Sequence, residues 1–70
     1  MIISIIIGTA DDIEAEYGCQ PIDGCAVSVV QLWDGDFGDQ DGFSTLAAAK
    51  AAYEWGTQHD DGHTYTYLML

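Results

Sequence analysis

Positive charge is almost absent from this sequence, and that absence excludes several kinds of partner. Lys50 is the only lysine or arginine among 70 residues, whereas aspartate and glutamate together number 12, so the formal net charge is -11. Proteins bind nucleic acids by placing several lysines and arginines on the phosphates, and basic segments bind anionic membranes by the same attraction. We therefore expect neither direct nucleic-acid binding nor binding to a membrane surface.

Long apolar runs, proline and cysteine are also scarce. The apolar stretch from Met1 to Ile7 is interrupted by Ser4, is too short to cross a membrane and lacks the basic flank of a secretory signal, so we expect a cytoplasmic protein. Cys19 and Cys25 flank a turn that contains Pro21. A reducing cytoplasm favours two free thiols, and a disulfide that closes the turn is the alternative.

What remains is a chain that can fold as one domain over residues 1–70. Its length allows a single core, and an apolar fraction of 49% supplies enough surface for burial to offset the loss of chain entropy.

Three segments have the composition of β-strands. Residues 2–7 are mostly isoleucine and predict a central strand with apolar side chains on both faces. Residues 26–33 are rich in β-branched side chains, and residues 63–70 alternate in a strand pattern.

Two segments have helical signals. Thr9 precedes a short amphipathic stretch over residues 10–17 that ends before Gly18. The second, longer helix is predicted to begin after Ser44 as N-cap and to end at Gly56, with an apolar stripe at helical spacing formed by Leu46, Ala49, Ala52 and Tyr53. The resulting fold class is α+β. We expect a three-stranded antiparallel sheet, a fourth strand being left open, in the order 2-1-3 with one main helix on one face.

The segment 34–42, between the second strand and the longer helix, reads as an acidic loop. It and the later turn supply the expected partner-binding residues, which are Asp34, Asp36, Phe37, Asp39, Asp41, Asp60 and Asp61. Asp11 and Asp12 offer a second acidic patch. Because carboxylates attract cations at long range, the expected partner is a basic protein surface. Exposed aromatic rings among them, from Trp33, Phe37, Tyr65 and Tyr67, would add anchors for a protein partner.

Metal binding and catalysis have weaker sequence support. Four aspartates in segment 34–42 could hold calcium, but their spacing is not that of an EF-hand loop. Cys19, Cys25, His59 and His63 are the ligand types that zinc prefers, at unusual separations. No nucleophile or nucleotide motif is present, so we expect no enzyme, no metal and no cofactor.

A resemblance to a known group enters at Ala47-Ala48-Ala49-Lys50 through Glu54-Trp55-Gly56. This alanine-rich helix ending in Glu-Trp-Gly, before a turn and a last strand, resembles a segment of small phage-encoded anti-CRISPR proteins. The resemblance implies a viral inhibitor that binds a CRISPR-Cas effector in the host cytoplasm and blocks DNA recognition or cleavage.

The mechanism that this implies is occupation of a cationic DNA channel, as a DNA mimic if the carboxylates gather on one face. Three alternatives stay open: an acidic antitoxin or immunity protein, an anti-restriction protein, and a domain whose acidity serves solubility in concentrated salt.

Overall fold

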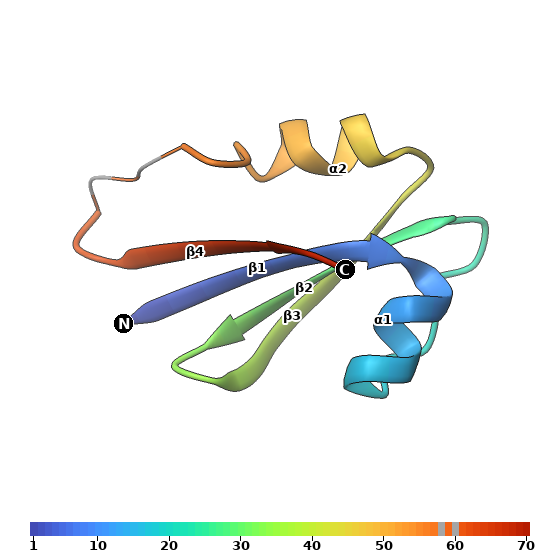
Figure 1. Ribbon diagram of the computed structural model, residues 1–70, viewed down its shortest axis with the longest axis horizontal. Coiled ribbons are helices and arrows are strands. Elements are labelled where there is room, and N and C mark those ends of the chain that lie inside the picture. Colours follow the sequence, from blue (N-terminus) through green and yellow to red (C-terminus); the bar gives the residue numbers. More distant parts are fainter. Residues whose placement is uncertain (58, 60) are drawn as a thin grey trace.

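The chain folds into a four-stranded sheet with one helix on each side (Figure 1). The structure is a computed structural model that describes residues 1–57, 59 and 61–70. Its elements are, in order, β1 (Ile2–Thr9), α1 (Ala10–Tyr17), β2 (Val27–Trp33), β3 (Asp36–Phe43), α2 (Leu46–Ala52) and β4 (Thr64–Met69). The strand order across the sheet is β3-β2-β1-β4.

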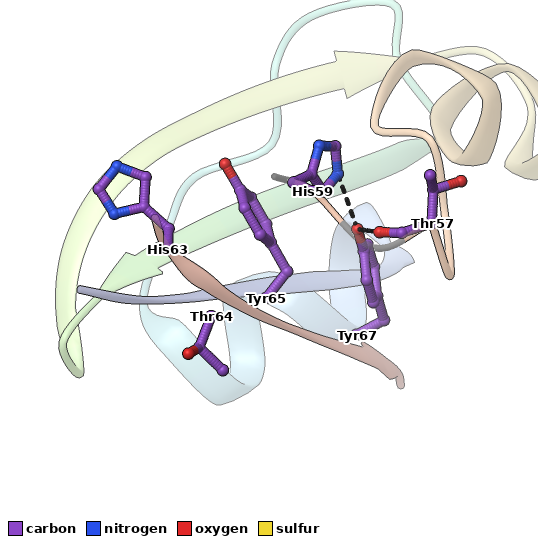
Figure 2. A pocket seen from close by; sticks show the side chains of 6 residues that line it. All are labelled: Thr57, His59, His63, Thr64, Tyr65 and Tyr67. Carbon is purple, nitrogen blue, oxygen red and sulfur yellow. Dashed lines mark hydrogen bonds between the residues drawn. The ribbon is translucent and has the colours of Figure 1, made fainter. Parts of the chain in front are cut away.

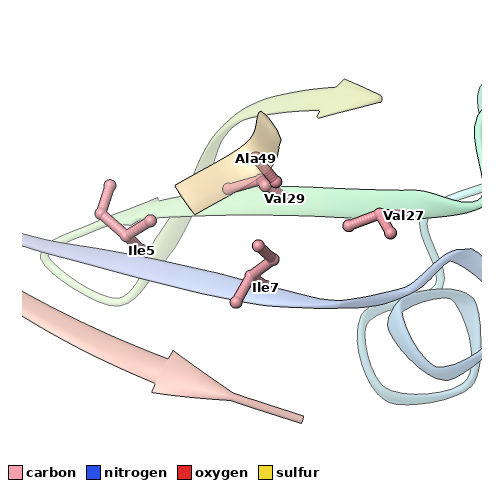
Figure 3. Close-up of a cluster of buried hydrophobic side chains, with 5 residues drawn as sticks. All are labelled: Ile5, Ile7, Val27, Val29 and Ala49. Carbon is pink, nitrogen blue, oxygen red and sulfur yellow. The ribbon is translucent and has the colours of Figure 1, made fainter. Parts of the chain in front are cut away.

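Strand β1 is central, as its isoleucine content predicts, and its two faces contribute to two core clusters. The single core that the chain length led us to expect is thus divided by the sheet. On one side Ile5 and Ile7 pack with Val27 and Val29 of β2 beneath Ala49 of α2 (Figure 3). On the other side Ile6 and Val30 are covered by Ile13 of α1, which is 0% exposed. Each face of the sheet therefore has its own covering helix, where the sequence led us to expect one main helix on one face.

Helix α1 begins and ends where its sequence signals predict. The hydroxyl of Thr9 accepts a hydrogen bond from the backbone N–H of Asp12, which satisfies one of the free donors of the first turn. Gly18 adopts the left-handed conformation and donates its N–H to Glu14 O. After this helix, Cys19 and Cys25 are free thiols, and both are half-buried.

Segment 34–42 is not the loop that its composition predicts. A tight turn at Asp34 and Gly35, both with positive φ (52° and 87°), returns the chain along β2 as β3. A two-residue turn with positive φ at both positions matches the twist of a hairpin, and Asp-Gly is one of its preferred sequences. The aspartates of this segment consequently lie on an edge strand.

The extra strand also changes the direction of β4. Because β3 reverses the chain once more, the crossover through α2 brings β4 in parallel to β1, from Ile2 opposite Thr64 to Ile7 opposite Met69. The expected 2-1-3 order of the three predicted strands is present as β2-β1-β4. The expectation that all neighbours are antiparallel is wrong, and the sheet is mixed.

Helix α2 is shorter than predicted at both ends. Its N-cap is Thr45, whose hydroxyl accepts from the N–H of Ala48, and not Ser44. The helix ends before Gly56, because Glu54 adopts a left-handed conformation with φ 48°. The N–H of Trp55 donates to Lys50 O, and the N–H of Glu54 donates to Ala51 O. This pair of bonds is a Schellman motif with Glu54 in the left-handed position.

The short α2 buries less of its predicted stripe. Ala49 is fully buried, whereas Leu46 is 40% exposed. In the described part of the chain, no helix has the length and apolar character needed to cross a membrane.

Candidate protein-binding face

The α2 side of the sheet carries carboxylates and aromatic rings in rows that cross all four strands. Opposed residues of neighbouring strands share a face, so the register fixes these rows. One row runs from β3 to β4 through Asp36, Trp33, Ile3 and Tyr65. The next row contains Asp39, Gln31, Ile5 and Tyr67. Helix α2 covers the part of this face farther from the Asp34-Gly35 turn, so the end near the turn is open.

Three exposed aspartates border this face along β3. Asp36, Asp39 and Asp41 lie opposite Trp33, Gln31 and Val29, and the rise of an extended strand puts Asp39 and Asp41 about 7 Å apart. Asp41 accepts a hydrogen bond from the hydroxyl of Tyr53. Burial of Tyr53, together with this bond, raises the pKa of its phenol well above the usual value. This hydrogen bond therefore holds the Asp41 carboxylate against the end of α2.

Two further carboxylates approach the same face from the side of β4. Asp61 Oδ2 accepts from the hydroxyl of Tyr65 at 2.7 Å, and Glu54 Oε2 lies 3.6 Å from His59 Nδ1. We call the surface bounded by these five carboxylates the acidic face; its residues are Trp33, Asp36, Asp39, Asp41, Tyr53, Glu54, His59, Asp61 and Tyr65.

The acidic face is hollowed beneath the end of α2. One hollow of about 350 Å³ lies between Ile3, Gln31, Tyr53 and Glu54, among other residues. A second, of about 260 Å³, lies over β4 and shares His59 and Tyr65 with the first (Figure 2). The two hollows adjoin at His59 and Tyr65, and we call them together the trough. Ile3 and Ile5 line the first hollow, and Tyr65 and Tyr67 line the second.

The rings in this trough are held in place by hydrogen bonds and stacking. The Tyr67 hydroxyl donates to Thr57 O at 2.7 Å, so the 3.0 Å contact with His59 Nε2 has the histidine as donor (Figure 2). The His59 ring in turn lies against Tyr65, with centroids 4.0 Å apart. Burial raises the pKa of the Tyr67 phenol, and the hydrogen bond to Asp61 is the main cause that raises the pKa of the Tyr65 phenol.

Trp33 is the exposed aromatic ring at the open end of the acidic face. It is 43% exposed, and its Nε1 donates to Gln31 Oε1 at 3.2 Å. The strand pairing shifts by one residue between Gln31 and Leu32, and Gly38 lies directly beneath the indole, where a Cβ atom would overlap the ring. The bulge and the absence of a side chain at Gly38 therefore let the indole ring of Trp33 lie against β3.

The structure divides the residues that the sequence suggested for partner binding. Asp36, Asp39 and Asp41 come together on the acidic face, and Asp61 reaches it from the opposite edge of the sheet. Phe37 is 59% exposed but lies opposite Leu32, on the α1 side. Asp34 is at the hairpin turn, where its Oδ1 accepts from the N–H of Ile2 at 2.7 Å. Asp60 lies outside the described residues.

The carboxylates of α1 form the second acidic region and point away from the acidic face. Asp11, Asp12, Glu14 and Glu16 are exposed on a helix whose inner side packs through Ile13 on the α1-side core. In the same region Tyr17 and Cys19 pack against that core. This region is a charged helix surface.

Neither metal set suggested by the sequence converges. Asp36 and Asp41 are separated by five strand positions, about 16 Å, so these two carboxylates cannot bind the same ion. Cys19 packs on the α1 side while His59 lies on the other side of the sheet. Within residues 1–57, 59 and 61–70 there is no group of three or more His, Cys, Asp or Glu side chains placed to hold a metal.

Several residues of the acidic face were not identified from the sequence as a group. Tyr53 and Glu54 belong to the end of α2, and the sequence places both inside a helix that continues to Gly56. The Asp-Gly turn is the signal that would have placed segment 36–43 on an edge strand and put its aspartates beside Trp33. Comparisons with protein-family models, with curated proteins and with solved structures gave no match to this chain.

Proposed function

We propose that this protein is an inhibitor that binds a basic surface of a DNA-handling protein through its acidic face, with a CRISPR-Cas effector as the first candidate partner. The observation that carries this proposal is the row of Asp36, Asp39 and Asp41 beside the exposed ring of Trp33. Among the described residues Lys50 forms no ion pair, and its Nζ lies 5.8 Å from the Trp55 ring. Within the part of the chain that the structure describes, Asp36, Asp39 and Asp41 therefore have no ion-pair partner.

The average density of negative charge on the protein surface is too low to account for tight binding by itself. The accessible surface is 4208 Å² and the net charge is -11, which averages about one charge per 400 Å², whereas duplex DNA carries roughly one per 100 Å². Electrostatic attraction would speed encounter with a cationic groove and set orientation. Affinity would have to come from anchors such as Trp33 and from the trough, which is the usual role of buried aromatic residues in protein interfaces.

The proposed mode of action follows from where the partner holds its DNA. CRISPR effectors bind nucleic acid in channels lined with lysine and arginine and read the short motif beside the target with basic side chains. An acidic face seated on such side chains would leave them unable to bind phosphate. The resemblance in the α2 segment, Ala47 through Gly56, supports this choice of partner, and the surface chemistry supports the broader class of basic DNA-binding grooves.

A competition experiment with charge-matched variants tests the proposal. A guide-loaded Cas effector is mixed with labelled target DNA, and the concentration of this protein that displaces the DNA is measured by gel shift. Asp36→Asn/Asp39→Asn/Asp41→Asn removes three carboxylates from the acidic face, while Asp11→Asn/Asp12→Asn/Glu14→Gln removes three from α1. We expect the first variant to be about tenfold weaker than the second, because three rim charges near 0.5 kcal/mol each add to about 1.5 kcal/mol.

Equal weakening of the two variants, or no displacement by the unmodified protein in low salt, would contradict the proposal. Circular dichroism in salt-free buffer separates it from adaptation to concentrated salt, because a salt-adapted domain should unfold there. A folded protein that displaces no DNA but neutralises a basic toxin would move the proposal to the immunity-protein class.

A further inference from the structure

The two edges of the sheet differ in how they deter pairing with another strand. Edge strand β3 carries Asp36, Asp39 and Asp41 and a bulge near Gly38, and the Asp39 carboxylate already accepts the N–H of Gln40 at 2.8 Å. Charges, bulges and occupied backbone groups are the features by which natural sheets block their edges. Edge strand β4, Thr-Tyr-Thr-Tyr-Leu-Met, has no charge, no proline and an unbroken register with β1.

The parallel register shows which backbone groups of β4 point outward. The N–H of Thr64 donates to Met1 O at 3.0 Å and that of Leu70 donates to Ile7 O at 2.8 Å, so residues of even number pair with β1. In a parallel ladder the residues between them direct both N–H and C=O to the other side. The outward groups belong to Tyr65, Tyr67 and Met69, and none of them has a backbone partner within the described residues.

Strand β4 itself carries no charged side chain, but carboxylates lie close to it. Leu68 is 51% exposed and Met69 41% exposed, and among the described elements neither α1 nor α2 makes extensive contact with β4. On the α2 side, Asp61 is tied to the tip of Tyr65 and Glu54 lies beside His59. An added strand would place alternate side chains next to Tyr65 and Tyr67 within reach of these carboxylates.

We infer that β4 is a docking edge for an extended, basic segment of the partner protein, which adds to the sheet as a fifth strand. The inference deepens the proposed function and rests on it for the charge of the partner. Backbone hydrogen bonds to Tyr65, Tyr67 and Met69 would supply affinity, and lysine or arginine side chains on the α2 side would supply selectivity. A second copy of this chain is the less favourable occupant, because each copy carries a net charge of -11.

Hydrogen exchange with two peptides of equal charge tests this inference. The probe is a capped eight-residue peptide of alternating lysine and threonine, and the control is the same peptide N-methylated along both edges, which keeps the charge but cannot pair as a strand. We expect the probe in excess to slow exchange of the Tyr65, Tyr67 and Met69 amides at least about tenfold in NMR spectra of the labelled protein. The control should not protect them.

A pair of substitutions supplies the matching test on the protein. Met69→Pro removes an outward N–H without touching the ladder to β1, and Met69→Ala shortens the same side chain but keeps the N–H. We expect the proline variant to bind the probe at least about fivefold more weakly than the alanine variant, with equal circular dichroism spectra.

The outcomes separate the edge from the acidic face. If both peptides bind equally, with salt-sensitive affinity and no protection on β4, the docking edge is wrong while attraction of a basic partner stands. If neither peptide binds in low salt, both proposals fail for this class of ligand. Concentration-dependent protection of the three amides without peptide, together with a dimer mass, would assign the edge to a second copy and overturn the inference.

Discussion

Tyr65 and Asp61 form a hydrogen bond of 2.7 Å that joins the start of the edge strand β4 to the turn before it. The bond is the main cause that lowers the pKa of the Asp61 carboxyl, and it also raises the pKa of the Tyr65 phenol. Asp61 accepts the backbone N–H of His63 as well, at 3.1 Å. This single carboxylate therefore organises the entry to β4.

The first prediction concerns the stability of the fold at low pH. Because the pKa of Asp61 is lowered in the folded state, its ionised form stabilises the fold above the ordinary carboxyl pKa near 3.8, and that stabilisation is lost as pH falls below it. Asp61→Asn should therefore be less stable than the unmodified protein at pH 6, with the difference shrinking toward pH 2. Urea unfolding at the two pH values measures this.

Tyr65→Phe is the control for the acid prediction, since it removes the hydrogen bond and leaves the carboxyl in place. It should reduce the pH dependence between pH 6 and pH 2 in the same direction. An unchanged dependence in both variants would show that the Tyr65–Asp61 bond is not formed in solution.

The second prediction concerns the stability of the fold at high pH. Tyr53, Tyr65 and Tyr67 have raised pKa values, and since the unfolded phenols ionise near 10, the folded protein should lose stability as pH rises above 10. Absorbance at 295 nm follows phenolate formation. Asp61→Asn should shift one ionisation to lower pH, because the hydrogen bond to Asp61 is the largest cause of the shift at Tyr65. Titration curves that superimpose would contradict the assignment.

The third prediction concerns the end of α2. Glu54 has φ 48°, a conformation that disfavours side chains with a Cβ, so Glu54→Gly should stabilise the protein by about 1 kcal/mol. Glu54→Gln keeps the backbone cost and removes the charge, and it should change stability by less than about 0.5 kcal/mol. Thermal or urea unfolding distinguishes the two variants. A glycine variant no more stable than the glutamine variant would mean that the Schellman ending is misplaced.

The fourth prediction concerns the packing of the Trp33 ring on Gly38. A Cβ atom at Gly38 would overlap the indole, so Gly38→Ala should displace the ring and cost about 1–3 kcal/mol. In a Trp33→Ala background the same substitution should cost much less, because the clash is gone. Equal costs in both backgrounds would show that the ring does not lie on Gly38.

The fold is predictable from the sequence wherever one segment decides its own structure. The isoleucines of β1 and the Thr9 and Gly18 caps of α1 locate those elements to within two residues. The hairpin was missed because aspartate and glycine in segment 36–43 have low strand propensity, and there the turn at Asp34 and Gly35 decides the pairing. That omission alone reverses the expected direction of β4.

The candidate site was predictable only in its chemical character. The excess of carboxylates indicates a cationic partner, but which of them share a face depends on register, which no local pattern reveals. Phe37 and Asp36 are neighbours in sequence and lie on opposite faces, whereas Asp41 and Tyr53 are distant in sequence and hydrogen-bonded. The end of α2 at Glu54 depends on backbone conformation, and Gly56 offered a stronger sequence signal in the wrong place.

Carboxyl footprinting tests the central claim most directly. The protein, free and bound to a guide-loaded Cas effector, is treated with a carbodiimide and glycine ethyl ester, and the modification of each carboxylate is read by mass spectrometry. The account predicts that binding protects Asp36, Asp39, Asp41, Glu54 and Asp61 several-fold and leaves Asp11, Asp12, Glu14 and Glu16 as reactive as before. Protection of the α1 carboxylates with an unchanged acidic face would contradict it.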